Sequence, residues 1–384
     1  MQTIYCDHNA STPLRAEVLE AMLPFLREEY GNASSVHAFG SRARCAVEEA
    51  RRQVAALIGA QPADIVFTSG GTESNNLAIR GVWRADRERT VVTTAIEHSS
   101  VRESVAMLQA QGGAARELPV DGEGRITASE IAAALTVPAV LVSVGWANNE
   151  IGTIQPIAAI AAECATRAIL LHVDAVQAVG KIPVHVDGID LLAISAHKIG
   201  GPKGVGALFI RGGVPLHPLL TGGGQERGRR AGTENVAGIV GMGQACRLAT
   251  TELGAFGEGC IALRDALWTG LSARIPDVCR NGPVGEDCLP NTLNVTFAGA
   301  RGETLVAALD LEGVAVSSGS ACAAGAGEPS HVLRALGRSA DAARDGVRFS
   351  FGRTNAIDDV ERLVDCTAAV VRRIRDARRP GRHD

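Results

Sequence analysis

Short apolar runs alternate with amphipathic segments through the first two thirds of the chain, and this alternation constrains the fold most. The runs predict strands at Ile65–Thr68, Val91–Thr94, Val140–Val144, Ile169–Val173, Leu191–Ile194 and Val205–Ile210. Helical periodicity lies between them at Arg42–Ile58, Thr72–Arg80, Val101–Gln111, Ala128–Leu135 and Ile157–Ala168. Because such alternation builds parallel strand pairs covered by helices, the sequence predicts an α/β fold with a mostly parallel sheet. Functional groups are then expected in loops at the carboxyl ends of the strands.

The pattern changes in the last third of the chain. A helix of small residues, Gly238–Leu248, leads into a helical stretch up to Ile275, and strands are predicted at Asn291–Phe297, Gly313–Ser317 and Gly346–Phe351. A chain of 384 residues exceeds the length at which one core usually suffices. We therefore expect a large domain at residues 14–250 and a smaller α/β domain made of residues 1–13 and 251–384.

Composition excludes several classes of function. A net charge of −4 does not favour a nucleic-acid partner, and charged residues interrupt the longest apolar stretches, so no membrane span is expected. The N-terminus lacks the basic start and apolar run of a signal peptide. Nine cysteines without a CxxC pair predict reduced thiols in a cytoplasm and no intrinsic metal site. All of them except Cys322 are expected to be buried.

Lysine is rare in this chain. Only Lys181, Lys198 and Lys203 are found among the 38 basic residues. Lys198 follows a predicted strand and precedes a glycine loop, which places its amine in a site at the strand end. A free lysine is neutral in only about one molecule in 2,500 at pH 7, so a nucleophilic role requires desolvation or a neighbouring cation. The alternative is a lysine that merely caps the strand.

A second polar group follows the preceding strand, where Asp174 is expected at the strand end with Gln177 three residues later. A buried carboxylate requires a positive partner. The ring nitrogen of pyridoxal 5'-phosphate would supply that charge, and a lysine linked to the cofactor with an Asp at its ring nitrogen is the expected environment. Gln177 could then donate a hydrogen bond to the ring oxygen. Asp174 could instead cap a helix.

Two segments are candidates for binding the phosphate. Residues 65–74, IVFTSGGTES, read as a strand, a glycine turn and a helix start, which directs backbone N–H groups at an anion. Residues 225–233, QERGRRAGT, are the second candidate, although they could be an exposed charged loop. His98 and Asn149 also follow predicted strands, and a histidine there could stack on the cofactor and move protons.

Residues 317–327, SSGSACAAGAG, surround the Cys322 thiol with glycine and other small residues. A loop with almost no core-forming side chains predicts a mobile, solvent-reachable nucleophile rather than a buried thiol. An ordinary thiol is only a few per cent ionised at pH 7, so a neighbouring base or cation is expected.

Together these segments resemble the cysteine desulfurases of the NifS/IscS family, and most closely the NifS branch. The resemblance covers nearly the whole chain, through GNASSVH, TSGGTESNN, EHSSV, WANNEIGT, HVDAVQAVGK, SAHKIGGPKGVG, QERGRRAGTEN, SSGSAC and EPSHVLRALG. It implies a fold-type I pyridoxal-phosphate transferase, with a mostly parallel seven-stranded sheet flanked by helices, a smaller α/β domain and a catalytic cysteine loop at about residues 317–330.

The resemblance also implies residue roles. Lys198 resembles the cofactor-linked lysine, Cys322 the persulfide-forming cysteine and His98 the stacking histidine and proton shuttle. The other implied cofactor contacts are Gly71, Thr72, Asn149, Asp174, Gln177, Ser195, His197 and, from the second subunit of a homodimer, Thr233. The implied substrate contacts are Asn32, Asn149 and Arg348, the last of which would clamp the carboxylate of L-cysteine.

The implied activity converts L-cysteine into L-alanine and a persulfide. The persulfide would supply iron–sulfur cluster assembly through a scaffold protein, including nitrogenase metalloclusters in the NifS branch, and Cys322 could transiently ligate a cluster on that scaffold. The alternatives are a selenocysteine lyase, another pyridoxal-phosphate lyase or transaminase, or a non-catalytic assembly scaffold. The Cys322 loop argues against a transaminase, which has no use for it, and an absence of bound cofactor would favour the scaffold.

Overall fold

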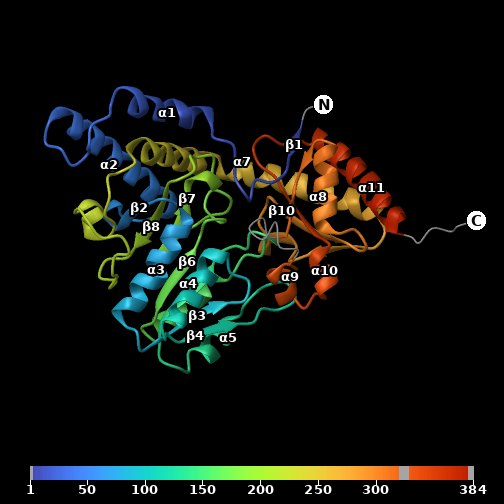
Figure 1. Cartoon of the computed structure of the whole chain (residues 1–384), viewed down its shortest axis with the longest axis horizontal. Coiled ribbons are helices and arrows are strands. Elements are labelled where there is room, and N and C mark those ends of the chain that lie inside the picture. The colour runs from blue at the N-terminus through green and yellow to red at the C-terminus, as the bar shows by residue number, and fades with distance from the viewer. Residues whose placement is uncertain (1–2, 320–327, 379–384) are drawn as a thin grey trace, which may run out of the picture.

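A seven-stranded sheet lies at the centre of the N-terminal two thirds of the computed structural model, which describes residues 3–319 and 328–378 (Figure 1). Across the sheet the strands are β2 (Ile65–Thr68), β8 (Gly206–Ile210), β7 (Leu191–Ser195), β6 (Leu170–Asp174), β5 (Ala139–Gly145), β3 (Thr90–Thr94) and β4 (Ala115–Leu118). Strands β7, β6, β5, β3 and β4 pair in parallel, whereas β8 is antiparallel to both of its neighbours. The predicted mostly parallel sheet is confirmed.

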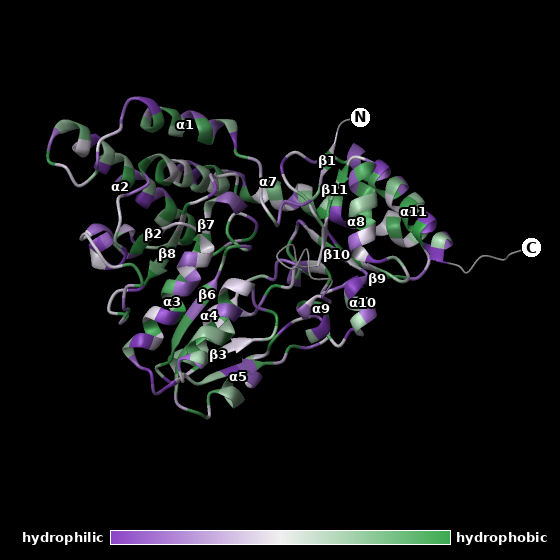
Figure 2. Cartoon of the chain, viewed as in Figure 1, coloured by the Kyte–Doolittle hydropathy of each residue, from purple (hydrophilic) through white to green (hydrophobic). Residues whose placement is uncertain are grey.

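Helices cover both faces of this sheet. They are α1 (Ala16–Arg27), α2 (Ala38–Ile58), α3 (Gly71–Ala85), α4 (Ser99–Ala110), α5 (Ala128–Ala134), α6 (Ile157–Ala165) and the first half of α7 (Val236–Arg274). Val91 of β3 packs in the cluster that contains α3 and α4, while Val92 packs in the cluster that contains α2 and α6, as alternating strand side chains require. The covering helices carry both hydrophobic and hydrophilic residues (Figure 2).

A second hydrophobic cluster lies in the C-terminal part of the chain. Its antiparallel sheet has the order β12 (Ser317–Ser318), β13 (Gly346–Ser350), β10 (Thr292–Phe297) and β9 (Val278–Asn281). Strand β1 (Ile4–Tyr5) pairs in parallel with β11 (Val314–Ala315), and the helices are α8 (Gly302–Leu311), α9 (His331–Ala335), α10 (Ala340–Arg344) and α11 (Asp358–Arg378). Helix α7 contributes Met242 to the first core and Leu267 to the second. The domain division at residue 250 falls inside this helix and stays a prediction.

The structure differs from the sequence-based expectations at several elements. The single strand expected at Gly313–Ser317 is two short strands, β11 and β12, which belong to different sheets. Strands β4 and β9 were not predicted, because each is four residues long and lacks a continuous apolar run. Helix α1 was also not predicted.

The expectation that all cysteines other than Cys322 are buried is wrong for Cys45, Cys279 and Cys366. Cys6, Cys164, Cys246, Cys260 and Cys288 are buried, Cys366 is half-buried, and Cys45 and Cys279 are exposed. Burial raises the pKa of Cys164, Cys246 and Cys260 to about 12, which keeps these thiols protonated. Within residues 3–319 and 328–378, no helix is both long and apolar enough to cross a membrane.

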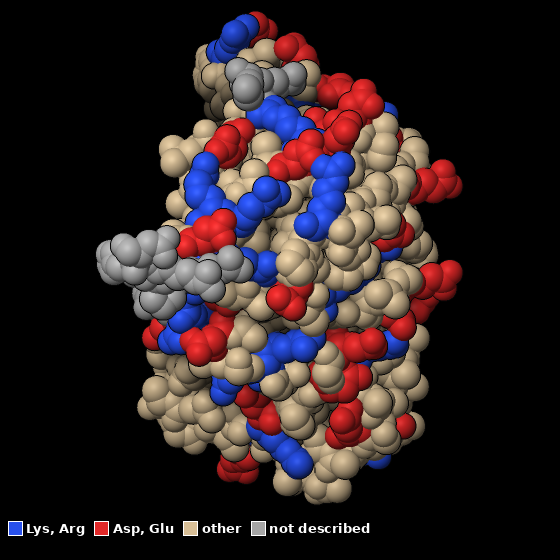
Figure 3. Space-filling view, turned by 90° about the vertical axis from the view of Figure 1, so that its right-hand side faces the viewer, with Lys and Arg blue, Asp and Glu red and all other residues tan. Residues whose placement is uncertain are grey.

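The face formed by the C-terminal elements carries positive and negative side chains interspersed with one another (Figure 3). Ion pairs in this part of the chain join Arg301 to Asp341 at 3.0 Å and Arg373 to Glu312 at 3.3 Å. This face is therefore of mixed charge.

Candidate active site

A cavity of about 530 Å³ lies where the two parts of the chain meet, at the carboxyl ends of β5, β6 and β7. Ten residues that the sequence singled out line it: Gly71, Thr72, His98, Asn149, Asp174, Gln177, Ser195, His197, Lys198 and Arg348. They come from both parts of the chain, since Arg348 lies on β13. The fold thus brings together residues as far apart in the sequence as Gly71 and Arg348, which are separated by 277 positions.

Lys198 lies in the short turn Ala196–Lys198 that follows β7. Its Nζ donates hydrogen bonds to the backbone oxygens of Asn9, at 2.6 Å, and Ala10, at 2.8 Å. These acceptors belong to the segment after β1, which extends from the C-terminal sheet to the cavity. The amine is thereby held at the cavity wall.

Asp174 ends β6 and is only 8% exposed. Its Oδ2 accepts from Asn75 Nδ2 at 2.7 Å, and its Oδ1 accepts from the backbone N–H of Val176 at 3.0 Å. Both donors are neutral, and no ion pair to this carboxylate is found among residues 3–319 and 328–378. A cationic group bound in the cavity would compensate its charge.

His98 is the N-cap of α4, and its Nδ1 accepts from the backbone N–H of Ser100 at 3.1 Å. Because the Nδ1 atom accepts a hydrogen bond, the proton of the neutral ring lies on Nε2. Asn75 Nδ2 donates to Ser100 Oγ at 2.8 Å as well as to Asp174. Polar contacts therefore connect His98 to Asp174 through Ser100 and Asn75, two residues that sequence reasoning missed.

The N-terminus of α3 presents backbone N–H groups at the cavity. Gly70 at its N-cap has no side-chain capping bond, and the first N–H groups of any helix lack an intrahelical acceptor. A Cβ at Gly71 would lie 2.7 Å from Val176 Cγ2, so only glycine fits. His197 borders the same wall, and burial together with the neighbouring lysines lowers its pKa to about 4. Helix N–H groups and a neutral histidine are suited to holding a phosphate.

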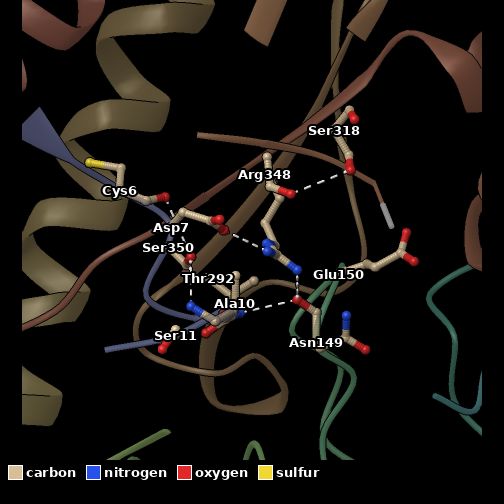
Figure 4. A network of polar contacts seen from close by, with 12 residues as sticks. Cys6, Asp7, Ala10, Ser11, Asn149, Glu150, Thr292, Ser318, Arg348 and Ser350 are labelled. Carbon is tan, nitrogen blue, oxygen red and sulfur yellow. Dashed lines mark hydrogen bonds and ion pairs between the residues drawn. The ribbon is translucent and has the colours of Figure 1, made fainter. Parts of the chain in front are cut away.

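Arg348 is 1% exposed and its guanidinium is already engaged (Figure 4). Its Nη2 donates to Asp7 Oδ1 at 2.6 Å, and its Nη1 donates to the backbone oxygen of Asn149 at 3.0 Å. Its Nε has no hydrogen-bond partner in the described part of the chain. The sequence did not anticipate Asp7, which fixes the orientation of an arginine that borders the cavity.

Two of the singled-out residues are not among the described residues that line the cavity. Asn32 is exposed and its Oδ1 accepts from the backbone N–H of Ser34 at 2.9 Å, and Thr233 is exposed. Cys322 lies outside the described residues. The nearest described segments before and after it lie near the site: β12 pairs with the strand that carries Arg348, and Glu328 and Pro329 line the cavity.

A further acidic residue, Glu97, lines the cavity and is 4% exposed. Its Oε1 accepts from Thr94 Oγ1 at 2.6 Å. Burial raises the pKa of this carboxyl from 4.5 to about 7, against the smaller opposing effect of that hydrogen bond. Sequence reasoning singled out the neighbouring His98 but gave no role to Glu97.

The model of the protein family described as "Aminotransferase class-V" matches residues 4–363 of the chain. The chain belongs to the class-V aminotransferase family. It is 47% identical over 376 residues to "Cysteine desulfurase IscS" of Dictyoglomus turgidum, covering 97% of this chain and 95% of the relative. Among solved structures, "NIFS-LIKE PROTEIN" matches with a TM-score of 0.91 and 38% identity, covering 97% of this chain and 100% of the other. "SspA in complex with cysteine" matches with a TM-score of 0.80 and 35% identity, covering 91% and 99%.

Enzymes of the class-V aminotransferase family depend on pyridoxal 5'-phosphate, and the cavity fits that cofactor. Lys198 could bond to its aldehyde, and the carboxylate of Asp174 could pair with its ring nitrogen. The start of α3, which has no side-chain cap, could hold its phosphate. The donor set therefore matches the three polar parts of the cofactor.

Glu97 predicts a pH-dependent stability. Because its folded pKa is raised, its contribution to stability is present below pH 4.5 and is lost as the pH rises towards about 7. Glu97→Gln removes this loss of stability. The difference in thermal unfolding midpoint, variant minus wild type, should therefore be about 2–4 °C larger at about pH 8 than at about pH 5. The exposed Glu103→Gln is the matched control. An equal difference at both pH values would contradict the assignment.

Proposed function

We propose that this chain is a cysteine desulfurase that uses pyridoxal 5'-phosphate to convert L-cysteine into L-alanine and a persulfide on Cys322. One observation carries the proposal: a single cavity joins Lys198, Asp174 and the start of α3 to the chain that follows Cys322. The similarity to curated cysteine desulfurases over nearly the whole chain supports the same activity.

We assign the cofactor contacts to residues of the cavity wall. Lys198 would bond to the aldehyde, Asp174 would pair with the ring nitrogen and Gln177 would donate to the ring oxygen. His98 would contact the ring, Asn149 would contact the ring oxygen and the substrate, and the phosphate would be held by Gly71, Thr72, Ser195 and His197. The chemistry that the cofactor supplies is electron withdrawal from the substrate carbons.

Arg348 is proposed to bind the carboxylate of the substrate. Its guanidinium is buried and is held by Asp7 and Asn149, so it does not need to be ordered when the substrate arrives. A charge-assisted pair with a carboxylate in such a site is stronger than a neutral hydrogen bond. Arg348 therefore selects free amino acids and sets the position of their side chains.

Protons move through Lys198 and His98 in this proposal. The amine of Lys198 would remove the proton from the Cα atom of the substrate. Because the Nδ1 of His98 is an acceptor, the Nε2 carries the proton of the neutral ring, and we assign to it the protonation of a group in the cavity. The His98–Ser100–Asn75 contacts hold the ring in place.

Sulfur transfer is assigned to Cys322. Its thiolate attacks the Sγ atom of the substrate and forms an S–S bond, while the Cβ–Sγ bond breaks. The electron pair of that bond remains with carbon, which takes up a proton and becomes the methyl group of alanine. The persulfide then passes to an acceptor, for which we propose an iron–sulfur scaffold protein, nitrogenase supply being one such use.

A homodimer is proposed as the working form. Thr233 is exposed and does not line the cavity of its own chain, which agrees with a contact to the phosphate of a second subunit. Tyr30 and Val36 are 78% and 96% exposed, and apolar side chains so exposed favour an interface. Asn32 lies between them and stays a predicted substrate contact. A reducing, cytoplasmic compartment also stays a prediction.

The role of Cys322 is testable by substitution. Cys322→Ser should lower alanine formation from L-cysteine by at least about a hundredfold and abolish the mass gain of one sulfur atom, because the nucleophile is lost. Product analysis and intact-mass spectrometry measure both effects. The exposed thiols provide matched controls, since Cys45→Ser and Cys279→Ser should retain both. Undiminished alanine formation by Cys322→Ser would exclude the nucleophilic role.

The role of Arg348 predicts a selective effect on substrate binding. Arg348→Gln should raise the KM for L-cysteine by about tenfold to a hundredfold, the value of a hydrogen bond to a charged group. The KM for L-cysteinamide, which has no carboxylate, should change little, and the exposed Arg334→Gln should leave both constants unchanged. Steady-state kinetics measure them. Equal increases for the acid and the amide would contradict carboxylate binding.

A further inference from the structure

Residues 225–233, the segment that carries Thr233, are attached to the large sheet by a buried ion pair that the proposed reaction does not use. Glu226 lies in this segment and Arg51 lies on α2, and their side chains are only 3% and 4% exposed. The Nη1 and Nη2 atoms of Arg51 donate to the Oε2 and Oε1 atoms of Glu226, each at 2.9 Å. This bidentate geometry fixes the orientation of both side chains.

The same ion pair caps one edge of the sheet. Strand β2 is an outer strand, so one of its edges has no strand partner within the described chain. The Oε2 of Glu226 accepts from the backbone N–H of Phe67 at 3.0 Å. The Nη1 of Arg51 donates to the backbone oxygen of Ile65 at 2.9 Å. Because the pair satisfies backbone groups of β2, it holds the segment at one place along this strand.

The backbone of the segment is strained at this point. Glu226 and Arg227 both lie in the left-handed region, with φ of 44° and 56°. Residues other than glycine persist there only where the surrounding structure holds them, and they are frequent at functional sites. Desolvation offsets much of the attraction within a buried ion pair, so stability alone does not account for the pair. A strained turn held by such a pair indicates that the conformation of this segment matters for function.

The contacts continue from Glu226 to Thr233. Gln225 is adjacent to Glu226, and its Oε1 accepts from the backbone N–H of Gly232 at 3.2 Å. Gly232 directly precedes Thr233, which is exposed. The ion pair and this hydrogen bond therefore set the position at which Thr233 leaves the surface of its own chain.

A second ion pair joins the segment to the start of α3. The Nε of Arg230 donates to Glu73 Oε1 at 2.9 Å, and Glu73 Oε2 accepts from the backbone N–H of Ser69 at 2.7 Å. Both side chains of this pair are partly exposed, unlike those of the first pair. The segment is thus anchored twice to its own subunit, while Thr233 does not line the cavity of that subunit.

We propose that Glu226 is a positioning residue that holds residues 225–233 so that Thr233 reaches the cofactor phosphate in the second subunit. The inference rests on the proposed function and on its homodimer. Glu226 acts in trans: it strengthens the retention of cofactor in the site of the partner subunit, whereas the site of its own chain does not depend on it.

Mixed dimers test this direction. One subunit of each dimer carries Lys198→Ala, so that cofactor can be trapped only on Lys198 of the other subunit. Borohydride trapping and mass spectrometry at intervals after dilution measure the rate of cofactor loss. Glu226→Ala in the Lys198→Ala subunit should speed this loss by about tenfold or more, because the hydrogen bond from Thr233 to a charged phosphate is lost. Glu226→Ala in the subunit that holds the cofactor should leave the wild-type rate.

Glu48→Ala is the matched control. Glu48 Oε1 accepts from Arg51 Nε at 3.0 Å, so it is a second carboxylate on the same arginine, but it lies on α2 and does not hold the segment. Its loss should leave the wild-type rate in either subunit. Glu48 also remains as a partner for Arg51 when Glu226 is replaced, which limits the damage to folding. Glu226→Gln, which keeps an acceptor for Phe67, should give a smaller increase, again only from the Lys198→Ala subunit.

The outcomes separate this inference from the proposals on which it rests. A wild-type rate with Glu226→Ala in the Lys198→Ala subunit would overturn it, and so would equal increases from both placements, because a purely structural role acts within its own chain. Thr233→Ala in the Lys198→Ala subunit should also speed the loss. If it does and Glu226→Ala does not, this inference alone fails. An unchanged rate with Thr233→Ala would overturn the homodimer contact, and wild-type enzyme without cofactor on Lys198 would overturn the proposed function itself.

Discussion

The N-terminal segment around Asn9 is the constraint on which the site depends. It leaves the C-terminal part of the fold, where β1 pairs with β11, and reaches the carboxyl ends of the large sheet. Its backbone oxygens accept from Lys198, while the Nδ2 of Asn9 donates to the backbone oxygen of Asn149 at 3.1 Å. Buried backbone groups must find such partners. These hydrogen bonds therefore stabilise the packing of the N-terminal two thirds of the chain against the C-terminal part. They also fix the position of the Lys198 amine.

Burial of charge gives the cavity its chemistry. Asp174 accepts hydrogen bonds from neutral donors, whereas Arg348 forms an ion pair with Asp7. Two lysines share one asparagine, and Glu97 is protonated more readily than an ordinary carboxyl. Such perturbed groups cluster where a protein performs acid–base or nucleophilic chemistry. A cofactor with a positive ring and a negative phosphate is complementary to this arrangement.

The sequence predicted those helices and strands in which apolar residues follow a clear pattern. The large sheet followed from apolar runs between amphipathic helices, whereas β4 and β9 lack such runs and β11 and β12 are only two residues each. Motif residues at strand ends, such as Asp174 and Lys198, were singled out from the sequence, and they line one cavity. Asn9, Asp7 and Asn75 were missed because their contacts join segments far apart in the chain. The exposure of Cys45 and Cys279 likewise depends on tertiary packing that composition does not encode.

Covalent trapping of the cofactor tests the account most directly. Borohydride reduction of the holoenzyme followed by peptide mapping should place the cofactor on Lys198, the amine held at the cavity wall by Asn9 and Ala10. With three lysines in the chain, the assignment by mass is unambiguous. Cofactor found on Lys181 or Lys203, or on no lysine, would contradict the account.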